Sequence, residues 1–331
     1  MKPVRLLVLG TGGMANTHAM NFATIAGVEL VAAVDVDQVR VQSFALRHDI
    51  AKTFTSLDEA IAWGEFDAVT NVTPDKIHYP TTLKLLAAGK HVLCEKPIAL
   101  SASEAENLRA VAEANPNIKV MEAFMYRFHP QWQSAKKLVD AGRIGTLKTI
   151  QSFFSYYNDD PQNIRNQVEA GGGGLMDIGC YPVSLSRFIF GTEPTRVFAA
   201  VENDPAMQTD RLTSGILEFE AGTSTFTCST QLAPFQQVNI LAIEGRIEIL
   251  IPFNAPPDQP ARIWVHTHSG SEKIDFEPID QYTLQGNAFS KAILENSTVP
   301  TPLSDAVSNM RVIDGLFHSA KSGGWQALTD I

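Results

Sequence analysis

The segment Leu6-Leu7-Val8-Leu9-Gly10-Thr11-Gly12-Gly13-Met14-Ala15 decides the fold of the amino-terminal half of the chain. Its first four residues are apolar without interruption, which is typical of a parallel strand covered on both faces. Glycines follow, and small or apolar residues from Ala15 to Ala26 then repeat at helical spacing. The segment therefore predicts a strand, a glycine turn and a helix whose first N–H groups favour an anion.

The glycine turn matches the G-x-G-x-x-A variant of the dinucleotide-binding fingerprint, with Ala15 at the third small position. A second apolar strand, 30–34, ends at Asp35, roughly where a ribose-binding acid is expected. A carboxylate there accepts a hydrogen bond from the ribose 2′-hydroxyl and repels a 2′-phosphate. This favours NAD, with NADP as the other candidate; alternatively, Asp35 only caps the following helix.

Strand and helix patterns alternate through the first 122 residues. Helices open on capping residues or end at glycines, as Ser101 and Gly89 illustrate. This alternation predicts an α/β domain with a doubly wound parallel sheet, a Rossmann fold, over residues 1–122. The predicted strands are 6–9, 30–34, 67–72, 92–95 and 118–121.

Composition sets limits on the class of protein. At 331 residues the chain is longer than one core usually grows, which predicts two domains. The net charge of −10 argues against a nucleic-acid-binding protein. No apolar stretch approaches the ~20 residues of a membrane span, and the start lacks the shape of a signal peptide. We therefore expect a cytoplasmic protein in which Cys94, Cys180 and Cys228 are reduced.

Residues 123–331 show many short strands, with hairpin turns at Ala221-Gly222 and Glu244-Gly245. This pattern predicts an α+β domain with a large open, mainly antiparallel sheet. Residues 239–243 are apolar on both alternations. Helices of the chain can cover one sheet face, so we expect the other to be buried in a homodimer or homotetramer. The predicted strands are 149–157, 196–201, 212–219, 223–232, 238–243, 247–253 and 263–266, and the predicted helices are 130–141, 175–190, 282–295 and 305–321.

The strand at 92–94 ends abruptly in Glu95-Lys96-Pro97. Functional groups of an open parallel sheet gather at such carboxyl ends. A buried Glu–Lys pair is costly unless it is satisfied, so this one is either a structural ion pair or part of a site. His78 follows Thr73-Pro74 near the same edge, where it either faces a nicotinamide or caps a helix.

Together these motifs resemble the glucose-fructose oxidoreductase/inositol dehydrogenase/rhizopine-catabolism (Gfo/Idh/MocA) family, and the resemblance extends through 122–130 and 172–181. It implies an NAD(P)-dependent oxidoreductase that acts on a sugar, polyol or cyclic diol. It also implies that the cofactor is bound by Gly10, Thr11, Gly12, Gly13, Met14, Asp35, Thr73, Pro74, His78, Glu95, Lys96 and Arg127.

The resemblance further implies that Lys96, Asp177 and Tyr181 carry the catalysis. Asp177 and Tyr181 are four residues apart and share one face of a predicted helix, although a buried structural hydrogen bond would give the same pattern. The pKa values of tyrosine and lysine side chains are both about 10 in water, and an ammonium beside a phenol favours the phenolate.

We therefore expect Tyr181 to exchange the proton with the substrate hydroxyl while Lys96 lowers the phenol pKa, or the reverse. Asp177 would orient the sugar or Lys96. Glu95 would position Lys96 or contact the nicotinamide ribose.

The family often carries histidine at the position of Tyr181, and tyrosine resembles the branch of xylose and dihydrodiol dehydrogenases. This favours a pyranose oxidised at its anomeric carbon, or a cyclic diol, with the loop 158–170 deciding the substrate. The alternatives are a glycosidase that oxidises its substrate transiently, a non-catalytic cofactor-binding regulator and a purely structural oligomer. His266 and His268 share a strand face but lack a third ligand, so we expect no metal site.

Overall fold

The computed structural model describes residues 2–328 of the 331-residue chain. These residues form two compact units. The first contains the chain up to Met125 together with Tyr282–Val307, and the second contains Tyr126–Gln281 and the chain from Ser308 onward. The limits 1–122 and 123–331 remain our proposal for the two domains, to which these units add the observation that 282–307 packs with the amino-terminal part.

Six parallel strands build the sheet of the first unit in the order β3-β2-β1-β4-β5-β6. The order reverses between β1 and β4, which is the topology of a doubly wound dinucleotide-binding fold. This confirms the predicted fold class of the amino-terminal half. The strands are β1 (Val4–Leu9), β2 (Val28–Val34), β3 (Lys52–Phe54), β4 (Ala68–Asn71), β5 (His91–Glu95) and β6 (Val120–Ala123).

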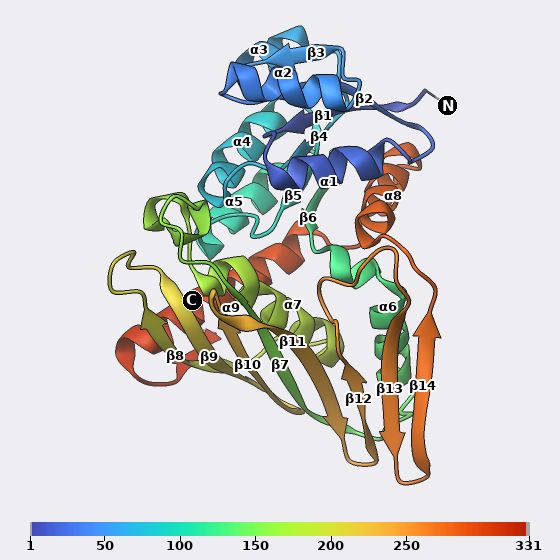
Figure 1. Cartoon of the computed structure of the whole chain (residues 1–331), viewed down its shortest axis with the longest axis vertical. Coiled ribbons are helices and arrows are strands. Elements are labelled where there is room, and N and C mark those ends of the chain that lie inside the picture. The colour runs from blue at the N-terminus through green and yellow to red at the C-terminus, as the bar shows by residue number, and fades with distance from the viewer. Residues whose placement is uncertain (1, 329–331) are drawn as a thin grey trace. The chain divides into compact units, whose positions relative to one another are not determined.

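Two helices of the first unit begin at serine capping residues. The Ser56 hydroxyl accepts the N–H of Asp58, and the Ser101 hydroxyl accepts the N–H of Glu104, each at 3.2 Å. The helix α4 packs against α5, whereas α8 lies beside the end of α1 (Figure 1). The helices are α1 (Gly13–Phe22), α2 (Gln38–Arg47), α3 (Leu57–Trp63), α4 (Asp75–Ala87), α5 (Ala102–Glu113) and α8 (Gln281–Leu294).

The second unit contains a nine-stranded sheet in the order β14-β13-β12-β11-β7-β10-β9-β8-β15. All neighbours are antiparallel except β10 and β7, which confirms a mainly antiparallel sheet. The strands are β7 (Leu147–Tyr157), β8 (Arg196–Asn203), β9 (Asp210–Phe219), β10 (Gly222–Ser229), β11 (Gln231–Ala242), β12 (Gly245–Ile249), β13 (Ala261–Thr267), β14 (Gly270–Phe276) and β15 (Gln326–Ala327).

The sequence pattern was wrong at several strand boundaries and missed the edge strands β3, β14 and β15. The predicted strand 223–232 ends at Ser229, and Leu232 already belongs to β11. Ser229 makes the break by accepting the N–H of Gln231 at 3.1 Å, a turn without glycine or proline to signal it. Strand β14 is largely exposed, so it lacks the apolar alternation that identifies a strand.

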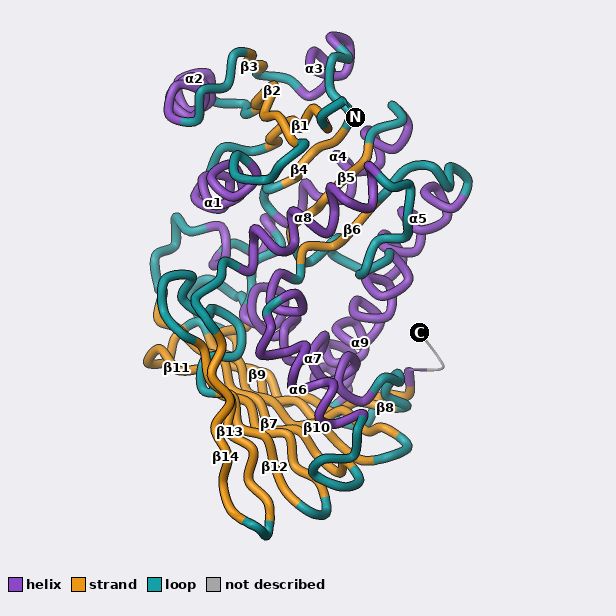
Figure 2. Tube along the Cα trace, turned by 90° about the vertical axis from the view of Figure 1, so that its right-hand side faces the viewer, coloured by secondary structure: helices purple, strands orange, loops and turns teal. Residues whose placement is uncertain are grey.

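Three helices of the second unit cover one face of its sheet: α6 (Pro130–Asp140), α7 (Cys180–Phe190) and the part of α9 (Leu303–Ser322) from residue 308 onward. Figure 2 shows them on the same side of the strands, and among residues 2–328 no helix of this unit covers the opposite face. None of the helices in the described part of the chain combines the length and apolarity needed to cross a bilayer.

Candidate active site

The glycine turn after β1 admits only glycine at its first position. Gly10 has a φ of +89°, and a Cβ atom there would lie 2.9 Å from the carbonyl oxygen of Val72. At Gly12 and Gly13, by contrast, a Cβ would meet no atom within 4 Å. Helix α1 begins at Gly13, and no side chain caps its amino terminus, so its first N–H groups can bind a phosphate. The turn therefore fits the pyrophosphate of a dinucleotide.

Asp35, directly after β2, contacts this turn. Its Oδ2 accepts the N–H of Thr11 at 2.9 Å and the Thr11 hydroxyl at 2.7 Å. Burial raises the pKa of Asp35, but the N–H of Asp37, Thr11 and the charge of Arg40 lower it below its ordinary value. The carboxylate is therefore charged at neutral pH. Asp37 is the residue that caps α2, by accepting the N–H of Arg40 at 3.0 Å, so the alternative of Asp35 as the cap is wrong.

Glu95, the last residue of β5, is buried and bound by His18 of α1. The Nε2 of His18 lies 2.8 Å from Glu95 Oε1, and its Nδ1 lies 2.7 Å from the hydroxyl of Thr70. The other carboxylate oxygen accepts the backbone N–H of Lys96 at 3.3 Å. Burial raises the pKa of Glu95, but His18 and the charges of Lys96 and His78 lower it below its usual range. Glu95 thus holds the backbone of the residue that carries the catalytic candidate amine.

His78 lies in α4 with 1% of its surface exposed. Its Nδ1 is 2.8 Å from the carbonyl oxygen of Pro97, and its Nε2 is 2.7 Å from the carbonyl oxygen of Thr73. The hydroxyl of Thr73 in turn donates to Oδ1 of Asn71 at 2.7 Å. His78 therefore joins the turn after β4 to the turn after β5.

The predicted cofactor residues of the first unit lie around one edge of its sheet. They follow the carboxyl ends of neighbouring parallel strands, on both sides of the switch point between β1 and β4. Nucleotides bind open α/β sheets at this position. Gly10 and Thr11 follow β1, Asp35 follows β2, Thr73 and Pro74 follow β4, Glu95 ends β5, Lys96 follows it, and Met14 lies in the first turn of α1.

Asp177 of the second unit lies in a π-helical turn, Leu175–Gly179, that leads into α7. This corrects the prediction of an α-helix that starts at 175; π-helical turns occur often at functional sites. The Oδ2 of Asp177 accepts the hydroxyl of Tyr156 at 2.6 Å, and its Oδ1 lies 3.1 Å from Nε of Arg165. The carboxylate is therefore oriented by two residues that the sequence reasoning did not single out.

Gly172, Gly173 and Gly174 are packed against protein groups. A Cβ at Gly173 would lie 2.0 Å from Oδ1 of Asp210, whose Oδ2 accepts the N–H of Leu175 at 2.6 Å. Burial raises the pKa of Asp210 to about 6, and the charge of Asp177 acts in the same direction. The glycines thus allow Asp210 to hold the start of the π-helical turn.

Tyr181 lies in the first turn of α7 among other aromatic rings, with 6% of its surface exposed. The ring centroids of Phe253, Phe154 and Tyr126 are 5.3, 5.8 and 5.9 Å from that of Tyr181. Apolar surroundings disfavour a phenolate unless a cation compensates. Lys96 belongs to the first unit and Tyr181 to the second, and their convergence remains a prediction.

Arg127 is also in the second unit, where it is buried. Its Nη2 donates to the hydroxyl of Ser184 at 2.8 Å and to the Ser184 carbonyl at 3.1 Å, and its guanidinium lies over the ring of Phe188. These contacts hold η1 (Met125–Phe128) against α7. The role of Arg127 in cofactor binding remains a prediction.

His266 and His268 form no recognisable metal centre. The Nδ1 of His266 lies 2.7 Å from the hydroxyl of Ser271, and its Nε2 lies 3.3 Å from Glu248. Across residues 2–328, no group of three or more His, Cys, Asp or Glu side chains is placed to hold a metal ion.

Each of the two units matches a known protein family. Residues 4–124 match the family described as "Oxidoreductase family, NAD-binding Rossmann fold", and residues 132–249 match the "GFO/IDH/MocA C-terminal domain". The chain is 36% identical over 335 residues to an uncharacterized oxidoreductase of Rhizobium meliloti, covering 99% of this chain and 100% of that protein.

It is also 31% identical over 318 residues to D-xylose 1-dehydrogenase (NADP(+)) 2 of Haloferax volcanii, covering 96% and 97% of the two chains. A solved 3-ketoreductase from Actinomadura kijaniata, in complex with NADP and TDP-benzene, superimposes with a TM-score of 0.91 at 23% identity. That match covers 96% of this chain and 98% of the other, and it shows the shared fold.

Proposed function

This chain belongs to the Gfo/Idh/MocA family of NAD(P)-dependent oxidoreductases, and from that premise we propose that it oxidises a hydroxyl-bearing carbon of a sugar, polyol or cyclic diol. One observation carries the proposal. The glycine turn, Asp35 and the Glu95-Lys96 pair end neighbouring parallel strands, so a nucleotide site and a candidate acid/base share one sheet edge.

NAD is the proposed cofactor. The charged carboxylate of Asp35 accepts hydrogen bonds from Thr11, and a ribose 2′-hydroxyl can donate to the same oxygens. A 2′-phosphate would meet this negative charge. Arg40, whose Nη1 lies 3.8 Å from Asp35, is the group through which NADP could still bind.

The proposed chemistry divides between cofactor and protein. The bound nicotinamide supplies the hydride acceptor, and the protein must orient the substrate and remove the hydroxyl proton. We assign the proton to Tyr181, with Lys96 as the cation that stabilises its phenolate. Such positioned acid–base groups contribute ~10²–10⁴ in rate. In the second form of this proposal the roles are reversed, so that Lys96 exchanges the proton and Tyr181 assists it.

The substrate side belongs to the second unit. Asp177, oriented by Tyr156 and Arg165, presents a carboxylate that can accept sugar hydroxyl groups. Arg165 is the one Lys or Arg in the sequence 158–170, and it ties this loop to the carboxylate. Because the relatives include a D-xylose 1-dehydrogenase, we propose a pyranose oxidised at its anomeric carbon as the substrate, with a cyclic diol as the other candidate.

A screen of aldopyranoses, inositols and cyclic diols with NAD and NADP, followed by absorbance of the reduced nicotinamide, tests this function. We expect turnover of at least one pyranose or diol. Cleavage of a nitrophenyl glycoside with no net reduced cofactor would instead indicate a glycosidase. Cofactor binding without turnover of any member would indicate a regulator, and both outcomes contradict the proposal.

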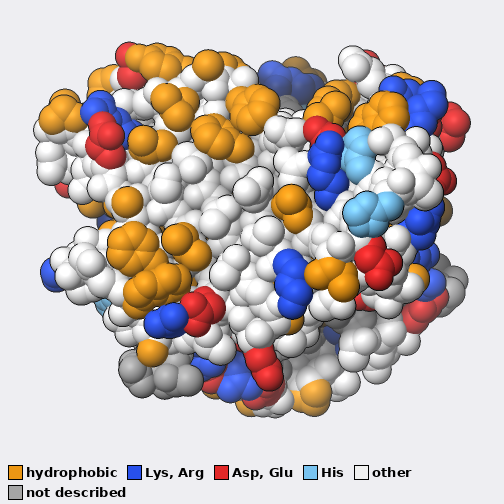
Figure 3. Space-filling model, turned by 90° about the horizontal axis from the view of Figure 1, so that it is seen from below, with side chains coloured by type: hydrophobic (Ala, Val, Ile, Leu, Met, Phe, Trp, Pro, Cys, Tyr) orange, Lys and Arg blue, Asp and Glu red, His pale blue; other side chains and the backbone are white. Residues whose placement is uncertain are grey.

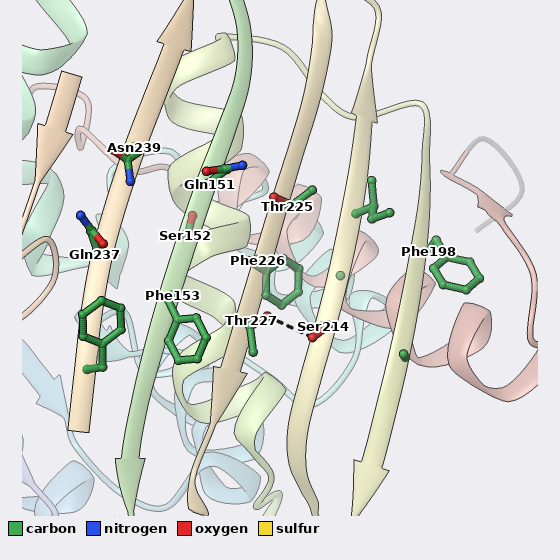
Figure 4. A pocket seen from close by; sticks show the side chains of 14 residues that line it. Gln151, Ser152, Phe153, Phe198, Ser214, Thr225, Phe226, Thr227, Gln237 and Asn239 are labelled. Atoms are coloured by element: carbon green, nitrogen blue, oxygen red, sulfur yellow. Dashed lines mark hydrogen bonds between the residues drawn. The ribbon is translucent and has the colours of Figure 1, made fainter. Parts of the chain in front are cut away.

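We also propose that the chain forms a homodimer or homotetramer through the sheet of the second unit, in the cytoplasm. The sheet face opposite the helices bears a depression of about 450 Å³ (Figure 4). Its lining side chains come from β7 to β11, and none carries a charge. Figure 3, a view from below, shows wide areas without charged side chains between groups of Lys, Arg, Asp and Glu. Loss of charge from the centre of a surface is typical of a protein interface.

A further inference from the structure

His78 has a pair of hydrogen-bond partners that a neutral imidazole cannot satisfy. Both partners, the carbonyl oxygens of Pro97 and Thr73, are acceptors only, and they lie 2.8 and 2.7 Å from its two ring nitrogens. A neutral ring has one N–H, so its other nitrogen would direct a lone pair at a carbonyl oxygen. Both hydrogen bonds form only when both nitrogens carry a proton.

We infer that His78 is held as a buried imidazolium and that, through its two carbonyl contacts, it positions Lys96. The first part concerns the first unit alone, and the second rests on the proposed function. His78 is a positioning residue in this account, because it acts on Lys96 through the backbone.

Burial makes a lone cation costly, so the surroundings of His78 must compensate it. With 1% exposure, it has three groups that carry or can carry negative charge and interact with it: Asp75 on its own helix, and Cys94 and Glu95 on β5. The positive charge of Lys96 acts on the same Glu95 carboxylate. Cys94 and the charge of Asp75 raise the pKa of His78, and the charge of His78 lowers the pKa of Glu95, so these three side chains are the partners that we assign to the imidazolium.

The direction of the pKa shift agrees with this geometry. Burial lowers the pKa of His78, but Cys94, the charge of Asp75 and the Pro97 carbonyl raise it to about 10. The ring is then protonated throughout the physiological range, so it acts as a permanent charge.

The consequence for Lys96 follows from the contacts on either side of it. Its N–H is held by Glu95 at 3.3 Å, and the carbonyl of the next residue, Pro97, is held by His78. The other carbonyl that His78 contacts belongs to Thr73, whose hydroxyl donates to Oδ1 of Asn71. The backbone around Lys96 is therefore tied to β4 as well as β5. A misplacement of about 1 Å at a catalytic group can cost ~10²-fold in rate.

His129 provides an internal comparison. It is also 1% exposed, but its Nδ1 accepts the N–H of Gln131 at 3.2 Å, which requires an unprotonated nitrogen. Burial lowers its pKa to about 4. One chain thus contains two buried histidines for which we expect opposite protonation states.

Nitrogen-15 NMR of the full chain labelled at histidine tests the charge directly. Between pH 7 and 8.5 we expect both ring nitrogens of His78 to carry protons and His129 to show one. A His78 with one protonated nitrogen in this range would overturn the inference. This measurement uses the wild-type protein and needs no substrate, so it is independent of the proposed function.

Hydrogen exchange tests the positioning without turnover. In a His78→Gln variant we expect two amides on either side of Pro97 to exchange about tenfold faster, because the Pro97 carbonyl loses its partner. They are the Lys96 amide, which donates to Glu95, and the Ile98 amide, which donates to Oε1 of Glu122 at 2.8 Å. His91→Gln, at the opposite end of β5, is the control. Where His78→Gln fails to fold, His78→Asn serves in its place. Unchanged exchange at these amides in a folded His78 variant would overturn the positioning.

Turnover then separates the two proposals. Once the screen has identified a substrate, we expect His78→Gln to lower kcat by ~10–100-fold. The KM for NAD should change by less than about threefold. A wild-type kcat in this variant would overturn the positioning while leaving the proposed function intact. An inactive wild-type chain with a doubly protonated His78 would contradict the proposed function alone.

Discussion

The Nε2 of His18 lies 2.8 Å from Oε1 of Glu95, and this contact joins helix α1 to strand β5. The same helix opens at the glycine turn, and the same strand ends at Glu95, directly before Lys96. A single buried contact therefore links the phosphate-binding end of the unit to its catalytic candidate. The N–H of Lys96 on the other Glu95 oxygen continues the link.

Replacing His18 by phenylalanine should uncouple these elements. Glu95 would remain buried without its hydrogen-bond partner, which costs ~1–3 kcal/mol of unfolding free energy, and kcat should fall with it. Urea unfolding and steady-state rates check this. His18→Gln is the matched control because its amide can still donate to Glu95. Equal stability and kcat in the phenylalanine variant and wild type would contradict the proposed link.

Asp35 should set the preference between the two nicotinamide cofactors. In Asp35→Ser the negative charge beside the ribose is removed while Arg40 remains, so the ratio of kcat/KM for NAD to that for NADP should fall by ~10-fold or more. Asp37→Asn, which keeps a cap on α2, should leave the ratio unchanged. A ratio that moves in neither variant would refute this role for Asp35.

His129 should make the stability of the second unit pH-dependent. Because burial lowers its pKa to about 4, the unfolded chain binds a proton below pH ~6.5 that the folded chain does not. The free energy of unfolding is therefore unaffected by protonation of this residue above pH ~6.5. As the pH falls toward 4, it decreases by up to about 3 kcal/mol.

Urea unfolding of wild type and His129→Asn between pH 7 and pH 4 measures this difference. Asparagine keeps an acceptor for the N–H of Gln131 but does not titrate. The stability of the wild type should therefore fall relative to the variant over this range. Parallel curves would mean that His129 is not held neutral.

The uncharged sheet face should be an interface between copies of this chain. Thr225→Arg places a charge at its centre, on β10, and should convert the oligomer into a monomer in sedimentation velocity at micromolar concentration. Val39→Arg, on an exposed position of α2, is the control and should sediment like wild type. A monomeric wild-type chain would refute the interface.

Much of the fold could be predicted because its signals are local. Continuous apolar runs mark the parallel strands, and Gly10 is required where β1 passes Val72 within contact distance. The exposed strand β14 and the break at Ser229 gave no such signal. Edge strands and turns without glycine are decided by pairing with the rest of the sheet, which a single sequence does not display.

The site divides in the same way. Asp35 and the Glu95-Lys96 pair stand out because they end predicted strands. His18, Tyr156 and Arg165 were missed because their partners are distant: His18 meets Glu95 77 positions away, and Tyr156 meets Asp177 21 positions away. Asp210, at the start of β9, likewise meets Leu175 of the π-helical turn 35 positions away. Such contacts are set by tertiary structure, and no local pattern predicts them.

The central claim, that Lys96 and Tyr181 act as one acid–base pair, is tested most directly by kcat of Lys96→Met on the substrate found in the screen. Lys84→Met, an exposed lysine on α4, is the control, and NADH binding is measured on the same samples. We predict that Lys96→Met binds the cofactor but loses ~10²–10⁴ in kcat. A kcat within about threefold of wild type would contradict the claim in either form.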